Sequence, residues 1–318
     1  MLDMPRQRDY RKMLSPPYSR RAVASLEEEI RTAVRELLAP HLSTGEIDVY
    51  RDLAVPLATR VIADLIGIPL DQALHLQALV EKNFSRHPGQ VGASDENNQA
   101  LGELMVGLVE LIEARRSDSN ASGDDHIAVM LRTPAEGGPM TTGAIVSAVF
   151  TMLVTGIEVV PLSVANTAFY LAQQPGQRRM LVDDPSLIPY AFAESLRFDQ
   201  PTNLLGRTVK EDVLMRGQKL RAGQGVMFLW ASGNRDEEEF VDADRFDISR
   251  RPRRSLSFGH GRHKCIGEHI GNLEGRIILE ELLAAAPEYE VREGASRAYT
   301  EFLHGYTQMP IEFAATGR

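Results

Sequence analysis

The segment that decides the fold of this 318-residue chain reads Ser257-Phe258-Gly259-His260-Gly261-Arg262-His263-Lys264-Cys265-Ile266-Gly267. It contains the only cysteine of the chain, and it precedes a run of apolar residues at helical spacing: Ile270, Leu273, Ile277, Ile278, Leu282 and Leu283. Free backbone N–H groups at the start of that helix, and the positive end of its dipole, would lower the thiol pKa and donate hydrogen bonds to the sulfur. The segment therefore predicts that Cys265 is a thiolate, the form of cysteine that binds iron.

The rest of the segment suits a flat, anionic ligand. Gly259 and Gly261 permit backbone angles that other residues disfavour, and Gly267 allows the following helix to lie close to such a ligand. Arg262 and His263 can pair with anionic groups on the edge of the ligand. Taken as residues alone, the segment also allows an alternative, a buried structural cysteine.

The segment resembles the heme-binding signature of the cytochrome P-450 superfamily, in its bacterial, soluble class. That signature is Phe, Gly, any residue, Gly, any residue, His, any residue, Cys, any residue, Gly, and every specified position is present. The resemblance implies heme b (iron protoporphyrin IX) as cofactor and Cys265 as the metal ligand. It also implies that four further residues of the segment contact the cofactor: Phe258, Gly259, His263 and Gly267.

Helical patterns fill most of the chain. Apolar residues recur at helical spacing near 26–38, 54–66, 71–84, 98–115, 142–173 and 185–198, whereas 207–230 shows short β-rich runs with turn glycines. The patterns predict a mainly α fold with small β-sheets (α+β), and the resemblance implies a cytochrome P-450 fold in which residues 1–318 form a single heme-thiolate domain. Members of the family normally have a further portion before the counterpart of Arg11, so we expect an N-terminally shortened version with a less enclosed substrate site.

Charge and hydrophobicity limit the partners and the cellular location that we expect for the protein. The chain has 44 acidic and 35 basic side chains, a net charge of −9 that repels nucleic acid and anionic membranes. We find no apolar run close to the roughly 18 to 20 residues that cross a bilayer, and the polar start, broken by Pro5, is unlike a secretory signal. We expect a cytoplasmic protein without nucleic-acid or membrane partners.

Four residues upstream of the cysteine match supporting positions of the family, and a fifth departs from them. Glu194 and Arg197 lie three apart on one helix face and resemble the Glu-x-x-Arg pair that braces the core beside the heme, although such a pair is also common on helix surfaces. Arg207 and Arg11 match residues that contact the heme propionates. Gln7 stands where the family usually has His, so it can donate a hydrogen bond but carries no charge.

The predicted helix 142–173 contains the largest departure from the family. It reads Thr155-Gly156-Ile157-Glu158-Val159-Val160-Pro161, where the family has an acid followed by a threonine that together relay protons during dioxygen activation. Valine has the shape of threonine without its hydroxyl, so Glu158 is the expected proton carrier and Thr155, four residues before Val159, a candidate helper. Thr155 could equally bond back to its own helix. Pro161 removes an N–H and could open the helix for a water, or it could be a harmless kink.

The remaining walls of the site are expected to be apolar. They point to a small-to-medium hydrophobic substrate, contacted by Val149, Met152, Val159, Leu204, Leu205, Phe302 and Leu303. Basic residues crowd around the cysteine segment: Arg250, Arg251, Arg253, Arg254, Arg262 and Lys264. Such a basic face would attract an acidic electron donor, a ferredoxin-type protein served by its reductase, although a solvated basic loop has the same composition.

Three functions remain open from the sequence. The first is a heme-thiolate monooxygenase that takes electrons from a redox partner. The second, favoured by Val159, is a heme-thiolate enzyme that uses peroxide or rearranges its substrate without oxygenation. The third is a non-catalytic, P-450-like auxiliary or scaffold protein, against which the retention of Cys265, Glu194, Arg197 and Arg207 argues.

Overall fold

A computed structural model describes residues 3–87, 89–118, 123–135, 138–298, 300 and 302–315. Its helices are α1 (Arg6–Leu14), α2 (Arg20–Ala24), α3 (Glu27–Leu42), α4 (Val55–Ile66), α5 (Leu70–Phe84), α6 (Asp95–Ser117), α7 (His126–Arg132), α8 (Thr142–Gln173), α9 (Pro175–Asp183), α10 (Ile188–Phe198), α11 (Trp230–Gly233) and α12 (Glu268–Ala285). Short 3-10 turns, η1 (Pro16–Tyr18), η3 (Pro185–Leu187) and η4 (Gly261–His263), and a π-helical segment, η2 (Val49–Ala54), complete the helical part.

The strands are few and short. They are β1 (Glu46–Asp48), β2 (Pro134–Ala135), β3 (Gly138–Pro139), β4 (Leu204–Thr208), β5 (Val213–Met215), β6 (Gln218–Leu220), β7 (Gly225–Leu229), β8 (Tyr289–Val291), β9 (Ser296–Arg297), β10 (Tyr306–Gln308) and β11 (Pro310–Phe313). Antiparallel pairing gives one three-stranded sheet, in the order β1-β11-β8, and the two-stranded pairs β10-β9, β2-β3, β4-β7 and β5-β6. The mainly α fold with small sheets that the sequence predicts is confirmed.

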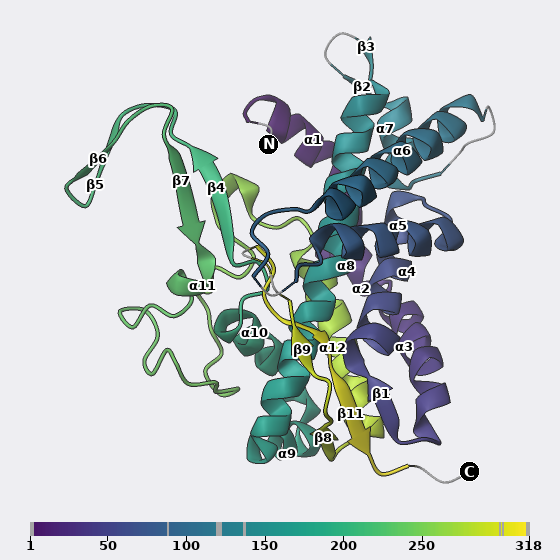
Figure 1. Ribbon diagram of the computed structural model, residues 1–318, viewed down its shortest axis with the longest axis vertical. Coiled ribbons are helices and arrows are strands. Elements are labelled where there is room, and N and C mark those ends of the chain that lie inside the picture. The colour runs from purple at the N-terminus through teal and green to yellow at the C-terminus, as the bar shows by residue number, and fades with distance from the viewer. Residues whose placement is uncertain are drawn as a thin grey trace.

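Helix α8 forms the axis of the molecule. In Figure 1 it runs through the middle of the helical body, and α4, α6, α10 and α12 all pack against it. Two apolar clusters meet along it, one with α3, α10 and α12 and the other with α4, α5, α6 and α7. Gly156 is required where α4 crosses α8, because a Cβ at that position would lie 2.6 Å from Cγ1 of Ile62.

The apolar character of α8 follows from this central position. An 18-residue window of the helix has a mean hydropathy of 2.0, so by length and composition it could cross a membrane, contrary to the sequence-based expectation. A bent pair, Val49–Ile66 with Leu70–Phe84, also passes that test when its two parts are taken together. Because 56% of the α8 window is buried inside the molecule, its apolar side chains are explained by packing against other helices.

The C-terminal strands belong to two different sheets. Strand β10 pairs with β9, and β11 enters the sheet between β1 and β8. The β4–β7 pair projects from the helical body, with the β5–β6 hairpin beyond it (Figure 1). The turns of this region use Gly217 and Gly223 at φ +79° and +85°, as the sequence predicts.

Candidate functional site

The cysteine loop is closed by backbone hydrogen bonds just before α12. Cys265 N–H donates to Phe258 O at 2.8 Å, and Gly259 N–H donates to Leu256 O at 2.8 Å. Gly259 and Gly261 adopt φ +68° and +72°, so the prediction that they take backbone angles unfavourable to other residues is confirmed. The loop holds the thiol at the N-terminal end of α12.

The protonation of the thiol differs from the sequence-based expectation. Burial raises the pKa of Cys265, while the backbone N–H of Gly267 hydrogen-bonds to it and acts in the opposite direction. The residue is nevertheless exposed toward the adjacent cavity. A thiol that is shielded by protein but open on one side becomes a thiolate most readily when a cation binds on that open side.

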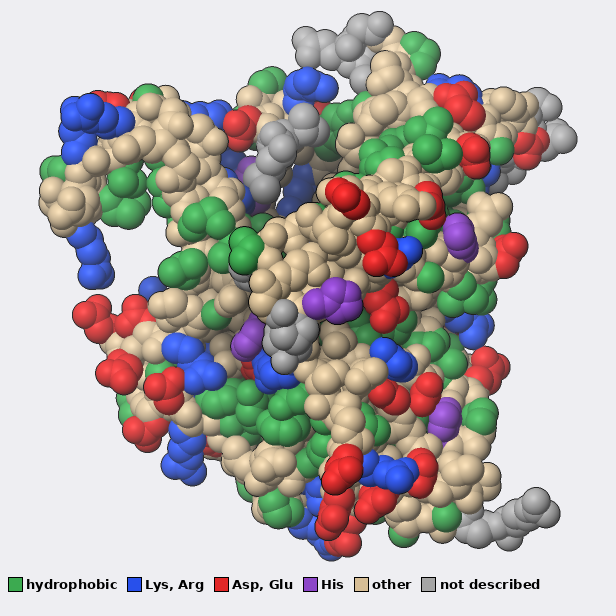
Figure 2. Space-filling model, viewed as in Figure 1, with side chains coloured by type: hydrophobic (Ala, Val, Ile, Leu, Met, Phe, Trp, Pro, Cys, Tyr) green, Lys and Arg blue, Asp and Glu red, His purple; other side chains and the backbone are tan. Residues whose placement is uncertain are grey.

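A cavity of about 290 Å³ lies against this thiol. Its walls come from α8, α12, β4, the cysteine loop and the Phe302–Leu303 segment. Predicted residues that line it are Met152, Thr155, Glu158, Val159, Leu205, Arg207, Phe258, Gly259, His263, Cys265, Gly267, Phe302 and Leu303. Figure 2 shows the surface hollowed between the projecting strands and the helical body, with basic side chains deep in the hollow.

Two residues predicted for the substrate pocket lie elsewhere. Val149 is fully buried in the apolar cluster around α4 to α7, one turn of α8 before Met152. Leu204 pairs with Leu229 at the start of β4, and its neighbour Leu205 lines the cavity. Because side chains alternate across a strand, only one of two adjacent strand residues can face the same cavity.

The residues at the edge of the cavity fit an anionic group. Gln7 Nε2 donates to Arg262 O at 2.9 Å and Arg11 Nη1 donates to Lys264 O at 2.5 Å, which holds α1 against the cysteine loop. Burial lowers the pKa of His263, and the nearby charges of Arg207 and Arg11 lower it further. Among the described residues, Arg207 hydrogen-bonds only to Gly206 O and has no carboxylate partner. A ligand with carboxylates at its edge would supply the missing negative charge.

The inner residues fit the flat body of a porphyrin. Cys265 offers sulfur on one side of the cavity, and Val159 and Val160 of α8 offer apolar surface. A Cβ at Gly267 would lie 3.8 Å from Cys265 Sγ, so glycine leaves the space beside the sulfur free. Sulfur, apolar walls and edge cations together are the donor set that a heme requires.

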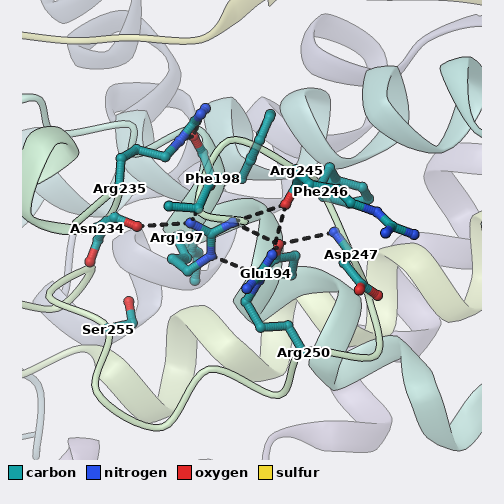
Figure 3. A network of polar contacts seen from close by, with 12 residues as sticks. Glu194, Arg197, Phe198, Asn234, Arg235, Arg245, Phe246, Asp247, Arg250 and Ser255 are labelled. Carbon is teal, nitrogen blue, oxygen red and sulfur yellow. Dashed lines mark hydrogen bonds and ion pairs between the residues drawn. The ribbon is translucent and has the colours of Figure 1, made fainter. Parts of the chain in front are cut away.

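Glu194 and Arg197 are fully buried beneath the cysteine loop. Arg197 Nε and Nη2 each lie 2.8 Å from a carboxylate oxygen of Glu194, and the guanidinium also donates to Asn234 O, Ala243 O and Arg245 O. Figure 3 shows the guanidinium between the carboxylate and these backbone segments. The pair therefore joins α10 to the loop before the cysteine, and the alternative of a surface pair is excluded by its burial.

The same network continues into the cysteine loop. Asn234 Nδ2 donates to Ser257 Oγ at 3.3 Å and Leu256 N–H donates to Asn234 Oδ1 at 2.7 Å. Gln200 Nε2 donates to Ser257 O at 3.1 Å. The position of the thiol is thereby coupled to α10 through side chains that are themselves held in place.

Glu158 is buried in α8 at the wall of the cavity. Burial raises its pKa to about 7, with a smaller contribution from the charge of Glu81. Thr155 Oγ1 donates to Thr151 O at 2.8 Å, so its hydroxyl bonds back to its own helix. Val159 faces the cavity without a hydroxyl, and its carbonyl accepts a 2.7 Å hydrogen bond from Ser163 Oγ. Glu158 is therefore the acid of α8 that can exchange a proton near neutral pH.

The cavity lining also contains residues that the sequence does not predict for the site, among them Tyr18, Trp230 and Glu274. Burial raises the pKa of Glu274 to about 8, and its Oε2 has no hydrogen-bond partner within the described part of the chain. Tyr18 lies 3.1 Å from Nε2 of His126, and burial lowers the pKa of His126 to about 4. The helical spacing of Glu274 within α12 could have indicated its inward position, whereas Tyr18 and Trp230 carry no local signal.

Several residues of the basic segment are engaged in contacts. Arg250 reaches Glu194 at 3.2 Å, Arg254 pairs with Glu239 at 2.8 Å and Lys264 pairs with Glu268 at 2.5 Å. Arg251 lies 4.5 Å from the ring centroid of Tyr190. The structure thus reduces the number of free positive charges on this face, chiefly by burying Arg250 in the network beside Glu194.

The fold and the cysteine-bearing cavity are those of a heme-binding oxidoreductase. Residues 1–286 match the protein family described as Cytochrome P450. The chain is 34% identical to "Cytochrome P450 130" of Mycobacterium tuberculosis, covering 92% of this chain and 72% of that protein. It is 30% identical to "Linalool 8-monooxygenase" of Pseudomonas putida, covering 98% and 76%. The crystal structure of CYP109E1 from Bacillus megaterium in complex with testosterone superposes with a TM-score of 0.89 at 28% identity, covering 98% and 82%.

This chain belongs to the cytochrome P450 family. The family consists of heme-thiolate oxidoreductases, and its cofactor is heme b. The resemblance inferred from the cysteine segment is confirmed by both the sequence relatives and the structural neighbours.

Proposed function

We propose that this protein is a monooxygenase that inserts one oxygen atom from dioxygen into a small-to-medium hydrophobic substrate, with residues 1–318 acting as a single heme-thiolate domain. The observation that carries the proposal is the exposure of the Cys265 thiol to a largely apolar cavity that is also lined by the buried acid Glu158 of α8. When bound, the heme supplies the redox chemistry that activates dioxygen. The protein's own residues would ligate the iron, bind the propionates, carry protons and contact the substrate.

Cys265 is the proposed iron ligand. Gly267 N–H donates to its sulfur and stabilises the thiolate, while Phe258 and Gly259 shape the loop around it. Arg11 and Arg207 provide positive charge for the propionates, and His263, whose pKa is lowered by burial and by these two arginines, provides a hydrogen-bond donor. Gln7 supports this arrangement indirectly, since its amide holds the backbone of Arg262.

Glu158 is the proposed proton carrier. Its pKa of about 7 means that both protonation states are populated near neutral pH, which suits a group that accepts and releases a proton in each cycle. Desolvation causes this pKa, so water entering the cavity would lower it. Because the Thr155 hydroxyl is bonded to Thr151 O, we assign Thr155 no more than a secondary part in proton transfer.

The substrate is proposed to be a compact apolar molecule. Met152, Val159, Leu205, Phe302 and Leu303 supply hydrophobic walls. Two similar proteins support this size class, since one is a linalool 8-monooxygenase and the other, CYP109E1, has been crystallised with testosterone. Both ligands are hydrophobic and contain few polar groups.

The electron donor is proposed to be an acidic, ferredoxin-type protein supplied by its reductase, and the protein is proposed to be soluble and cytoplasmic. Arg253 and Arg262 are exposed beside the cysteine loop, and neither has a carboxylate partner among the residues described. Both residues precede Cys265 in the same exposed segment of the chain, so an acidic partner docked on this segment would approach the cofactor from the sulfur side. Electron transfer that slows as salt is added would support this assignment.

One observation favours a second function. Val159 offers no hydroxyl at the cavity wall, and the neighbouring threonine is bonded to its own helix. Chemistry that needs fewer delivered protons, such as peroxide-driven oxidation or a rearrangement without oxygenation, would not depend on the missing group. Turnover with hydrogen peroxide but none with reduced ferredoxin and its reductase would select this alternative.

The primary test is the spectrum of the ferrous carbon monoxide complex of the purified, heme-loaded protein. We expect a strongly red-shifted Soret band in the wild type. Cys265→Ser and the matched variant Cys265→His should both lose it, although His can still ligate iron. A red-shifted band in either variant would show that Cys265 is not the ligand, and a normal spectrum without ferredoxin-driven turnover would contradict the monooxygenase assignment.

A further inference from the structure

A buried carboxylate outside the heme contacts joins the walls of the cavity. Asp199 follows α10, and both of its oxygens lie 2.8 Å from Nη2 of Arg297 in β9. His304 Nδ1 lies 2.8 Å from Asp199 Oδ1, and Tyr170 Oη donates to Oδ2 at 3.1 Å. Asn166 Nδ2 donates to Asp199 O at 3.1 Å. Burial alone would raise the pKa of Asp199, but hydrogen bonds from His304 and Arg297 outweigh it and hold the pKa below its usual range.

The residues next to this carboxylate belong to two chain segments, 201–203 and 302–304, that lie side by side in the wall of the cavity. Asn203 N–H donates to Phe302 O at 2.9 Å, His304 N–H donates to Pro201 O at 2.9 Å, and Thr202 pairs with Leu303 in an isolated antiparallel bridge. Thr202, Phe302 and Leu303 all line the cavity. Any change in the spacing of these two segments changes the shape of the space available to a ligand.

The segments 199–203 and 302–304 differ in the further contacts that hold them. On the 199–203 side, Gln200 is buried and bonds to Ser257 O and to Asn234 Nδ2. On the other side, Phe302 is only partly buried and stacks on Phe84 of α5 with a centroid distance of 6.1 Å. The Phe302–His304 segment is held by its backbone hydrogen bonds to 201–203, and the contacts of Asp199 with Arg297 and His304 add a second attachment beside it.

We propose that Asp199 is a positioning residue for substrate selectivity: through Arg297 and His304 it holds the Phe302–Leu303 wall inward and keeps the cavity narrow. The inference rests on the proposed function, because it concerns the substrate side of the same cavity. Arg297 provides the permanent part of the contact, since its guanidinium is charged at every physiological pH and also lies 4.7 Å from the ring centroid of Tyr306. His304, whose side chain is 45% exposed, is the part that can be removed without disturbing the core.

The class of substrate follows from this arrangement. With the wall held inward, the cavity accepts compact hydrophobic molecules and disfavours long or bulky ones. Release of His304 lets Phe302 move away from Phe84 and widens the opening toward α5. Because the His304–Asp199 pair is half-exposed, its loss should change relative ligand affinities by about 3- to 5-fold.

The test uses two spectroscopic probes of different size, imidazole and 1-octylimidazole, titrated into the heme-loaded protein and followed by the shift of the Soret band. We expect His304→Gln to lower the Kd of 1-octylimidazole by about 3- to 5-fold relative to that of imidazole. Asp199→Asn, which also removes the ion pair with Arg297, should lower it by at least as much. The exposed histidine of α5 supplies a matched control, and His75→Gln should leave both Kd values unchanged. The double variant should change the ratio no more than Asp199→Asn alone, because Asp199→Asn already removes the carboxylate partner of His304.

Restoring a hydrogen-bond donor opposite Asp199 supplies a second check. His304→Lys places a donor there and should recover the wild-type ratio of the two Kd values at least in part. An unchanged or raised ratio in His304→Gln, or additive effects in the double variant, would overturn the proposal. The two imidazoles bind whether or not any substrate is oxidised. If monooxygenase turnover fails, the Kd values can therefore still be compared, and only the proposed function is contradicted.

Discussion

Replacing Arg197 by lysine removes hydrogen bonds that hold the cysteine loop onto α10. The arginine donates two 2.8 Å bonds to Glu194 and further bonds to Asn234 O, Ala243 O and Arg245 O. A lysine ammonium has three donors and no planar fork, so at least one of these buried acceptors is left without a partner, and the bidentate pair is lost.

The loss of stability in Arg197→Lys depends on which hydrogen bonds of Glu194 and of the backbone carbonyls remain. Glu194 keeps the 3.0 Å bond from Asp247 N–H and the 3.2 Å contact with Arg250, so its carboxylate is not left alone. The loss then comes mainly from unsatisfied buried carbonyls, which cost roughly 1 to 3 kcal/mol each, and from weaker geometry in the ion pair. We expect the free energy of unfolding to fall by about 2 to 4 kcal/mol, a large part of the ~5 to 15 kcal/mol typical of folded proteins.

The assay is urea unfolding followed by far-UV circular dichroism, with heme content measured in parallel. Arg179→Lys is the matched control, because Arg179 pairs with Asp183 on the surface at 64% and 62% exposure and should lose less than about 0.5 kcal/mol. If Arg197→Lys costs no more than this control, the network does not brace the loop and the reasoning fails.

Two further changes test the acids and the missing hydroxyl of the cavity. Val159→Thr adds a hydroxyl at the cavity wall, so the amount of product formed per electron pair should rise and the release of peroxide should fall. Both are measured with a ferredoxin and its reductase as electron donors. An unchanged ratio of product to electrons consumed would show that proton delivery does not pass through this position. Glu274, whose pKa burial raises to about 8, stabilises the fold fully below pH ~4.5, and this stability is lost as pH rises through about 8. Glu274→Gln should therefore gain stability over wild type at pH 8 but not at pH 5, by urea unfolding, and a pH-independent difference would contradict its burial as an acid.

The local part of the site could be predicted because its residues are neighbours in the chain. The ten positions from Phe258 to Gly267 form one loop, and the positive φ angles of Gly259 and Gly261 follow from residue type. Glu194 and Arg197 are three residues apart on a helix, so their contact is nearly assured once the helix forms. In each case the backbone conformation alone brings the groups together.

Other features required the packed structure. The spacing of α8 predicts a buried helix but not which turn lines the cavity, so Val149 was assigned to the pocket although it lies in the core and Met152 lines the cavity. The thiol pKa was expected to fall because of the helix dipole, whereas burial raises it. The burial of a titratable group depends on every element that packs around it, so it cannot be predicted from the residues next to that group in the sequence.

The sequence by itself determined the helical class of the fold, the cysteine loop and the membership in the cytochrome P450 family, because these depend on short-range patterns of residue type. Only the tertiary structure decided how Asp199, Arg297 and His304 meet beside the cavity, and which acids lose contact with water. These contacts join residues about a hundred positions apart, and their geometry is set by the packing of α8, α10 and the C-terminal strands together.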